Sequence, residues 1–130
     1  MPAFKKVLFI DDDFITTNIC ERMMKLIDFA AEFVGTADGL QAKEYLVANI
    51  NSLPAIVFVD LHMTVMNGWE FLDWYTKWSK ENEIVIPVYV LSSSLSKEDF
   101  EQAYVFNVSG YIVKPITVGH LTEIMNKFAV

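Results

Sequence analysis

The chain has 130 residues, of which 53% are hydrophobic and 21% charged, and its formal net charge is −7. This length fits one domain over residues 1–130, and the composition is too apolar for a disordered segment. The acidic balance argues against direct nucleic-acid binding, which needs a basic patch to neutralise phosphates. It is compatible with a bound cation or a positively charged partner.

The sequence also indicates where the protein resides. Cys20 is the only cysteine, so no intrachain disulfide can form, which fits a reducing compartment. No apolar run approaches the roughly 18 residues of a membrane span, and the first residues lack the small-residue cleavage site of a signal peptide. We therefore predict a cytoplasmic protein with no membrane association.

The first predicted strand is Lys6–Ile10, an apolar run that ends in the carboxylates Asp11–Asp13. Asp13 is placed to cap a helix beginning at Phe14. Glu32–Thr36 predicts a shorter second strand. The helix between these strands is indicated by apolar residues at helical spacing, namely Ile15, Ile19, Met23, Leu26 and Ile27.

The third strand is the most clearly marked element. Asp38 and Gln41 have capping-box spacing and open a helix that Asn51–Pro54 ends. Ala55–Asp60 follows, five apolar residues before one carboxylate, which predicts a strand buried on both faces. A helix is then expected from Gly68 to about Lys80.

The rest of the chain continues the alternation. Ile84–Leu91 predicts a fourth strand, although Pro87 restricts its first half to an edge or a lead-in. A capping box at Ser96–Asp99 opens a helix, Ser109–Val113 predicts a fifth strand, and Thr117 caps a final helix. Five strands alternating with five helices predict an α/β fold, with a parallel sheet covered by helices on both faces.

Polar residues stand at the ends of four of these strands. The carboxyl ends of parallel strands share one edge of the sheet, where α/β proteins bind ligands. Asp11, Asp12 and Asp60 would form a hard-oxygen site suited to Mg²⁺. Lys114 can pair with Asp60 or with a phosphate oxygen, and the Ser92 hydroxyl can donate to the same phosphate. This set favours phosphoryl transfer onto Asp60.

The chain resembles the response-regulator receiver domains of two-component signalling. Each matching segment is weak alone, but together they are specific in order and spacing: Phe9–Asp13, Val59–Met63 with Gly68, Val90–Ser93 and Gly110–Pro115. The resemblance implies a (βα)₅ flavodoxin-like, doubly wound fold. It also implies that Asp60 accepts a phosphoryl group from a phosphohistidine of a histidine kinase or phosphotransfer protein.

The resemblance further implies a metal site. Mg²⁺ would be held by Asp12, Asp60 and the main-chain carbonyl of His62, with Asp11 acting partly through water. Lys114 would contact the phosphoryl group together with Ser92.

A switch is implied as well, in which Ser92 moves toward the phosphoryl group and Tyr111 on the fifth strand follows. The surface formed by the helix after Ser96, the strand Ser109–Val113 and the final helix would then change its preference for a downstream protein. We expect a monomer or weak dimer, and no enzyme activity beyond its own phosphorylation and dephosphorylation.

The helix after Gly68 is rich in aromatic side chains. We expect two or three of them to pack on the sheet, and a sharper alternative is an aromatic face for a partner. The residues concerned are Trp69, Phe71, Trp74, Tyr75 and Trp78.

Two other classes of protein share features with this sequence. Asp60–Thr64 superficially resembles the Asp-x-Asp-x-Thr loop of haloacid-dehalogenase phosphatases, but the second aspartate, their general acid, is missing. A flavodoxin-like binding module would share the fold, yet the loop after the first strand is acidic where a phosphate cradle is uncharged or basic. The receiver interpretation is preferred to both.

Overall fold

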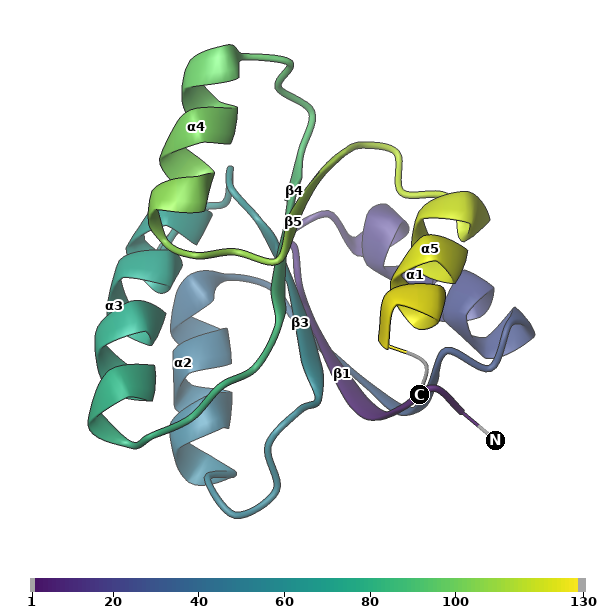
Figure 1. Cartoon of the computed structure of the whole chain (residues 1–130), viewed down its shortest axis with the longest axis horizontal. Helices are drawn as coiled ribbons and strands as arrows, with labels where there is room; N and C mark the ends of the chain where they lie inside the picture. Colours follow the sequence, from purple (N-terminus) through teal and green to yellow (C-terminus); the bar gives the residue numbers. More distant parts are fainter. Residues whose placement is uncertain (1, 129–130) are drawn as a thin grey trace.

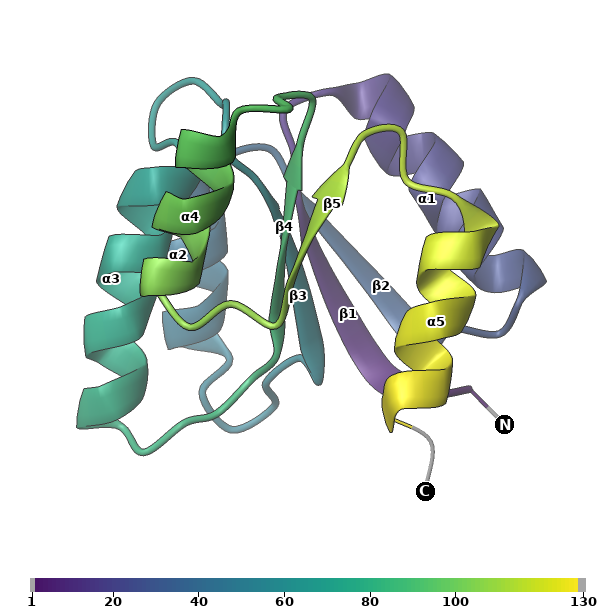
Figure 2. The same ribbon diagram turned by 45° about the horizontal axis from the view of Figure 1, so that its top comes forward.

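A single parallel sheet organises the chain. The computed structural model describes residues 2–128, in which five strands in the order β2-β1-β3-β4-β5 are flanked by five helices (Figures 1 and 2). The elements are β1 Phe4–Ile10, α1 Phe14–Leu26, β2 Ala30–Thr36, α2 Gly39–Ala48, β3 Ile56–Asp60, α3 Gly68–Glu81, β4 Val88–Ser92, α4 Lys97–Val105, β5 Gly110–Val113 and α5 Val118–Phe128. This architecture confirms the predicted fold.

The helices cover the sheet in two layers, with α1 and α5 on one face and α2, α3 and α4 on the other (Figure 2). Successive strand residues point to opposite faces, so Val7 and Phe9 pack toward the first layer and Leu8 and Ile10 toward the second. Both faces of β3 are buried from Ile56 to Asp60, as its continuous apolar run predicts. No helix among the described residues is long and apolar enough to cross a membrane.

Three predicted strand boundaries need correction. β1 begins two residues earlier than expected, because Phe4 is buried and donates its backbone N–H to Phe29. β2 likewise begins at Ala30, where it pairs with Phe4. β4 begins only at Val88, because Pro87 has no backbone N–H to donate to a ladder. The residues from 84 to 87 are therefore a lead-in.

Helix α1 buries only part of the arc that its apolar spacing suggests, since Met23 and Ile27 pack against the core. Ile15, Ile19 and Leu26 are 69%, 53% and 84% exposed, whereas Cys20 and Met24 are buried. A helical period predicts that a helix forms, but a wide apolar arc does not indicate which part of it meets the sheet.

The predicted N-caps are confirmed, but two predicted capping boxes are incomplete. Gln41 accepts the N–H of Ala37 rather than that of Asp38, and Ser96 donates its N–H to the Ser94 side chain. Asn67 and Glu70 form a complete box at the start of α3, which was not predicted from the sequence.

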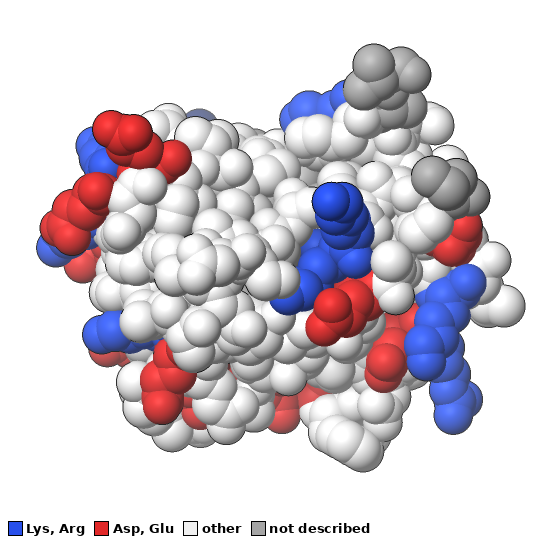
Figure 3. Space-filling model, turned by 90° about the horizontal axis from the view of Figure 1, so that it is seen from below, with Lys and Arg blue, Asp and Glu red and all other residues white. Residues whose placement is uncertain are grey.

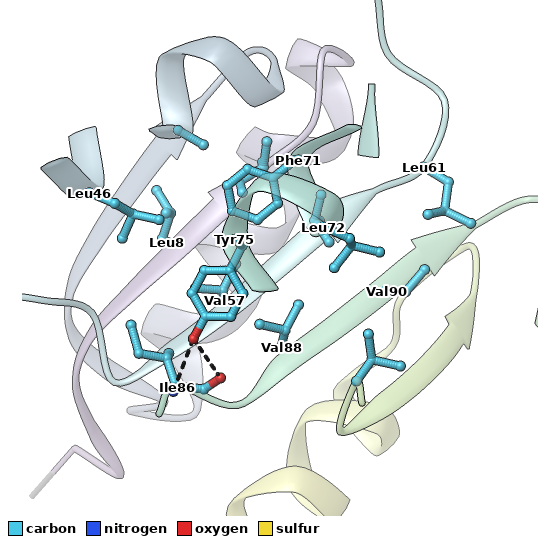
Figure 4. Close-up of a cluster of buried hydrophobic side chains, with 14 of the residues drawn as sticks. Leu8, Leu46, Val57, Leu61, Phe71, Leu72, Tyr75, Ile86, Val88 and Val90 are labelled. Atoms are coloured by element: carbon cyan, nitrogen blue, oxygen red, sulfur yellow. Dashed lines mark hydrogen bonds between the residues drawn. The ribbon is translucent and has the colours of Figure 1, made fainter. Parts of the chain in front are cut away.

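The aromatic residues of α3 divide between the core and the helix layer. Phe71 and Tyr75 are buried against the sheet (Figure 4), as expected for two of the five. Trp74 and Trp78 are half-buried and stack with their ring centroids 5.0 Å apart, and the Lys43 ammonium lies 5.7 Å from the Trp74 ring. An aromatic partner face remains a hypothesis.

Replacing Tyr75 by phenylalanine should lower the free energy of unfolding by about 1–3 kcal/mol. The Tyr75 hydroxyl donates to the carbonyl of Ile86 at 3.3 Å and accepts its N–H at 3.1 Å (Figure 4), and Ile86 is 8% exposed. The variant leaves both backbone groups without a partner. Urea unfolding measures the effect, with Tyr104→Phe on the exposed side of α4 as the control. Equal stabilities of the two variants would contradict this role.

The amino ends of the strands face away from the candidate site. On this face, seen in Figure 3, acidic and basic side chains lie beside one another around a broad uncharged area. The net negative charge of the chain therefore does not gather into one acidic patch here.

Candidate acidic site at the carboxyl edge of the sheet

Parallel pairing brings the predicted site residues to one edge of the sheet. Asp60 is the last residue of β3 and pairs with Leu91 of β4, one residue before Ser92. Asp11 directly follows β1. Lys114 directly follows β5 and donates its backbone N–H to the carbonyl of Ser92 at 2.8 Å. The ends of β4 and β5 are therefore fixed to each other beside Asp60.

Lys114 lies between two carboxylates. Its Nζ atom is 2.7 Å from Asp11 Oδ2 and 3.4 Å from Asp60 Oδ1. The Asp11 side chain is fully buried and that of Lys114 is 20% exposed, so water screens these ion pairs only in part. One ammonium group therefore faces two carboxylates. When both carboxylates are ionised, Lys114 balances only one of the two negative charges.

The crowding of charge is reflected in two pKa values. Burial raises the pKa of Asp60 to about 6, and the Asp11 carboxylate acts in the same direction, against the lowering effects of Lys114 and the His62 backbone N–H. Burial lowers the pKa of Lys114, but its hydrogen bond to Asp11 and the charges of Asp60 and Asp11 outweigh burial and raise it overall. Lys114 is therefore a stable cation, whereas the ionised form of Asp60 is less favoured than it would be in water.

The carboxylates have the composition of a hard-cation site. Asp11, Asp12 and Asp60 each offer one oxygen, and these three atoms lie within 4.8 Å of one another. Asp11 Oδ1 accepts the N–H of Asp13 at 2.8 Å, while the buried Oδ2 lies 2.7 Å from Lys114 Nζ. Clustered carboxylate oxygens are the ligands that fit Mg²⁺. The carbonyl of His62 as a further ligand stays a prediction.

The two predicted switch residues are joined through a third. Ser92 is fully buried, and its Oγ accepts the N–H of Ser94 at 3.0 Å. The Tyr111 hydroxyl donates to the carbonyl of Ser94 at 3.3 Å, and its ring packs edge-on against Phe100. Movement of the Ser92 side chain would disturb a loop that Tyr111 also contacts. The sequence carries no signal for this link, because Ser94 takes part through its backbone.

Gly68 is a second residue whose role the sequence did not indicate. A Cβ atom at this position would lie 2.4 Å from the backbone oxygen of Asp60 and 2.6 Å from Leu61 Cα. The N–H of Gly68 donates to the carbonyl of Leu61 at 3.1 Å. The start of α3 therefore packs directly against the backbone that carries Asp60.

Comparison with known proteins identifies the class. Residues 7–126 match the response regulator receiver domain, and the chain belongs to this family. Receiver domains accept phosphoryl groups from histidine kinases or phosphotransfer proteins and generally bind Mg²⁺ at an acidic pocket. The family match does not favour the phosphatase and flavodoxin alternatives.

Individual relatives agree with this assignment. The chain is 29% identical over 114 residues to the probable methanogenesis regulatory protein FilR2 of Methanothrix harundinacea, covering 85% of this chain and 72% of FilR2. It is 27% identical to the peroxide stress-activated histidine kinase mak1 of Schizosaccharomyces pombe over 92% of this chain, but it spans only 7% of mak1. A crystal structure of a two-component response regulator from Cytophaga hutchinsonii matches with a TM-score of 0.87, 28% identity and 96% coverage of both chains.

Proposed function

We propose that this protein is a phosphorylation-dependent signalling module in which Asp60 accepts a phosphoryl group from a histidine kinase or phosphotransfer protein. The observation that carries the proposal is the position of Lys114, which lies within 3.4 Å of Asp60 and 2.7 Å of Asp11. An ammonium group fixed by one carboxylate beside another is placed to neutralise charge on a phosphoryl group arriving at the second.

In the proposed reaction, a carboxylate oxygen of Asp60 attacks the phosphorus atom of a phosphohistidine. The new P–O bond forms as the P–N bond breaks, and the imidazole leaves with the electron pair. Since the pKa of Asp60 is about 6, the carboxylate is mostly ionised at pH 7 and needs no general base. Lys114 stabilises negative charge on the phosphoryl oxygens. Mg²⁺ held by Asp11, Asp12, Asp60 and the carbonyl of His62 would add further neutralisation.

Ser92 would carry the signal away from the site. Its Oγ accepts from Ser94, which leaves the hydroxyl proton available to a phosphoryl oxygen. Reorientation toward that oxygen would weaken the bond to Ser94, whose carbonyl holds Tyr111. We propose that this change alters the affinity of the α4, β5 and α5 surface for a downstream protein.

The remaining expectations form part of the same proposal. The module works in the cytoplasm as a monomer or weak dimer and contacts proteins rather than nucleic acid. Its only chemistry is the formation and hydrolysis of its own aspartyl phosphate.

Thermal unfolding with Mg²⁺ and beryllofluoride tests the proposed site. Mg²⁺ at tenfold excess over its Kd should stabilise the folded state by about 1.4 kcal/mol, which corresponds to a Tm increase of roughly 2–8 °C. Beryllofluoride, which mimics a bound phosphoryl group, should add a further increase. Asp60→Asn should abolish this second increase, whereas the control Asp73→Asn on the exposed face of α3 should retain it. A native chain that responds to neither addition would contradict the proposal.

A further inference from the structure

The outer edge of the sheet carries a hollow outside the candidate acidic site. β5 is the edge strand and lies between α4 and α5 (Figure 2). The hollow beside it has a volume of about 220 Å³, and its lining includes Tyr89 of β4, Tyr104 of α4, Tyr111 of β5, and His120 and Glu123 of α5. No lysine or arginine of the described chain lines it. The hollow therefore combines aromatic rings with one carboxylate and no basic side chain.

The Glu123 carboxylate has no partner in the part of the chain that the structure describes. None of residues 2–128 forms a hydrogen bond or an ion pair with it. Lys127 is one turn farther along α5, but its ammonium lies 5.9 Å from the centroid of the Phe128 ring. Because Glu123 is also exposed, a cation from outside the chain can reach the carboxylate without breaking an existing contact.

The tyrosine rings supply the second part of a cation site, because the faces of aromatic rings attract positive charge. Two of the rings are held in place by Phe100, whose centroid lies 4.9 Å from that of Tyr104 and 5.5 Å from that of Tyr111. Tyr104 is 41% exposed, so a ligand can reach its ring. A guanidinium group suits such a site, because it stacks on aromatic rings and pairs with a carboxylate through two parallel hydrogen bonds.

We propose that this hollow binds an arginine side chain of the downstream protein. The inference rests on the proposed function, in which α4, β5 and α5 form the surface that contacts that protein. The guanidinium would lie against the rings of Tyr104 and Tyr111 and pair with Glu123. The net charge of −7 attracts a basic partner from a distance, and the hollow determines where one of its basic side chains docks.

Two further hollows leave room for the residues that flank this arginine. One has a volume of about 250 Å³, shares Tyr111 with the first hollow, and is lined by the apolar side chains of Leu95, Phe100 and Val113. The other has a volume of about 540 Å³ and shares Glu123 with the first. A partner segment that follows β5 would therefore place an apolar side chain in one hollow and its arginine in the next.

Tyr111 makes the arginine site responsive to phosphorylation. Its hydroxyl donates to the carbonyl of Ser94, whose N–H donates to Ser92 Oγ. Reorientation of Ser92 toward a phosphoryl group would loosen this connection and allow one wall of the hollow to move. The affinity for arginine should therefore differ between the phosphorylated and unphosphorylated chain.

Titration with Nα-acetyl-arginine amide, followed through the ¹⁵N–¹H shifts of the protein at pH 7.5, tests the site. The ligand should shift the backbone signals of Gly110, Tyr111 and Glu123. Nα-acetyl-citrulline amide has a similar shape without the charge and should not shift them. Nα-acetyl-lysine amide should bind several-fold more weakly, because an ammonium group cannot form the bidentate pair. Equal shifts with the arginine and citrulline ligands, or shifts spread over all acidic parts of the surface, would overturn the proposal.

Matched variants examine the carboxylate and the ring separately. Glu123→Gln should weaken the binding of Nα-acetyl-arginine amide by about fivefold, whereas Glu44→Gln on the exposed side of α2 should leave it unchanged. Tyr104→Phe keeps the ring and should bind like the native chain, while Tyr104→Leu should bind several-fold more weakly. Equal affinities of Glu123→Gln and Glu44→Gln would overturn the proposal.

The same titration with Mg²⁺ and beryllofluoride distinguishes this inference from the proposed function. The affinity for Nα-acetyl-arginine amide should change at least twofold in the native chain and stay unchanged in Asp60→Asn. No binding in either state would overturn the arginine site, whatever happens at Asp60. Binding of equal strength in both states would instead contradict the proposed switch and leave the arginine site standing.

Discussion

At pH 7 and without Mg²⁺, Asp60→Asn is expected to be more stable than the native chain by about 1–2 kcal/mol. Burial and the neighbouring Asp11 carboxylate raise the pKa of Asp60 from 3.8 to about 6, so ionised Asp60 is a cost in the folded state. The full shift corresponds to about 3 kcal/mol, which solvent screening and the imperfect fit of an amide reduce. Asparagine removes the charge and keeps the shape.

The stability difference between Asp60→Asn and the native chain should depend on pH. Between pH 3.8 and about 6 the folded state binds more protons at Asp60 than the unfolded state does, so native stability falls as the pH rises through this window. The extra stability of Asp60→Asn over the native chain should therefore be absent near pH 3.8, increase between pH 3.8 and 6 and level off above pH 6.

Urea unfolding in the presence of chelator at several pH values measures this difference, with Asp73→Asn as the control for an exposed carboxylate. Addition of Mg²⁺ should reduce the difference in unfolding free energy between Asp60→Asn and the native chain at pH 7, because the cation relieves the repulsion between the carboxylates. An advantage that does not vary with pH would contradict the inferred crowding of charge.

Gly68→Ala is expected to destabilise the protein by about 2 kcal/mol or more and to impair the site. The added Cβ would lie 2.4 Å from the backbone oxygen of Asp60, and backbone atoms cannot rotate away as a side-chain end can. Alanine recovers about 1 kcal/mol through its helix propensity, which does not offset a clash of this kind. The β3–α3 connection must shift, and Asp60 shifts with it.

Gly119→Ala provides a matched control for this substitution. Gly119 also lies in the first turn of a helix, but its nearest contact would be Thr117 Oγ1 at 3.5 Å, an ordinary distance. This variant should be unchanged or slightly stabilised. Urea unfolding of both variants, with phosphorylation by a small phosphodonor, measures stability and site integrity together. Equal behaviour of the two glycine variants would show that Gly68 does not support the Asp60 backbone.

The proximity of the candidate site residues could be predicted from sequence because topology determines where strand ends meet. Asp11, Asp60 and Lys114 are far apart in the chain, but each directly follows or ends a short apolar strand. In a parallel sheet such positions converge on one edge, so their proximity follows from the strand pattern without knowledge of side-chain packing.

Features that depend on packing or on backbone groups could not be predicted in this way. Helix α1 leaves Ile15, Ile19 and Leu26 exposed, because contact with the sheet and α5 selects one part of a wide apolar arc. The link from Ser92 to Tyr111 passes through the carbonyl of Ser94, which every residue type possesses. The close packing of Gly68 on the Asp60 backbone appears only in three dimensions.

The most direct test of the proposed function is the intact mass after incubation with acetyl phosphate and Mg²⁺. The native chain, Asp60→Asn and Asp73→Asn should be compared, each with and without chelator. We expect one phosphoryl adduct on the native chain and on Asp73→Asn, lost on chelation, and none on Asp60→Asn. An adduct that persists on Asp60→Asn, or that forms equally well in chelator, would contradict Mg²⁺-dependent phosphoryl transfer to Asp60.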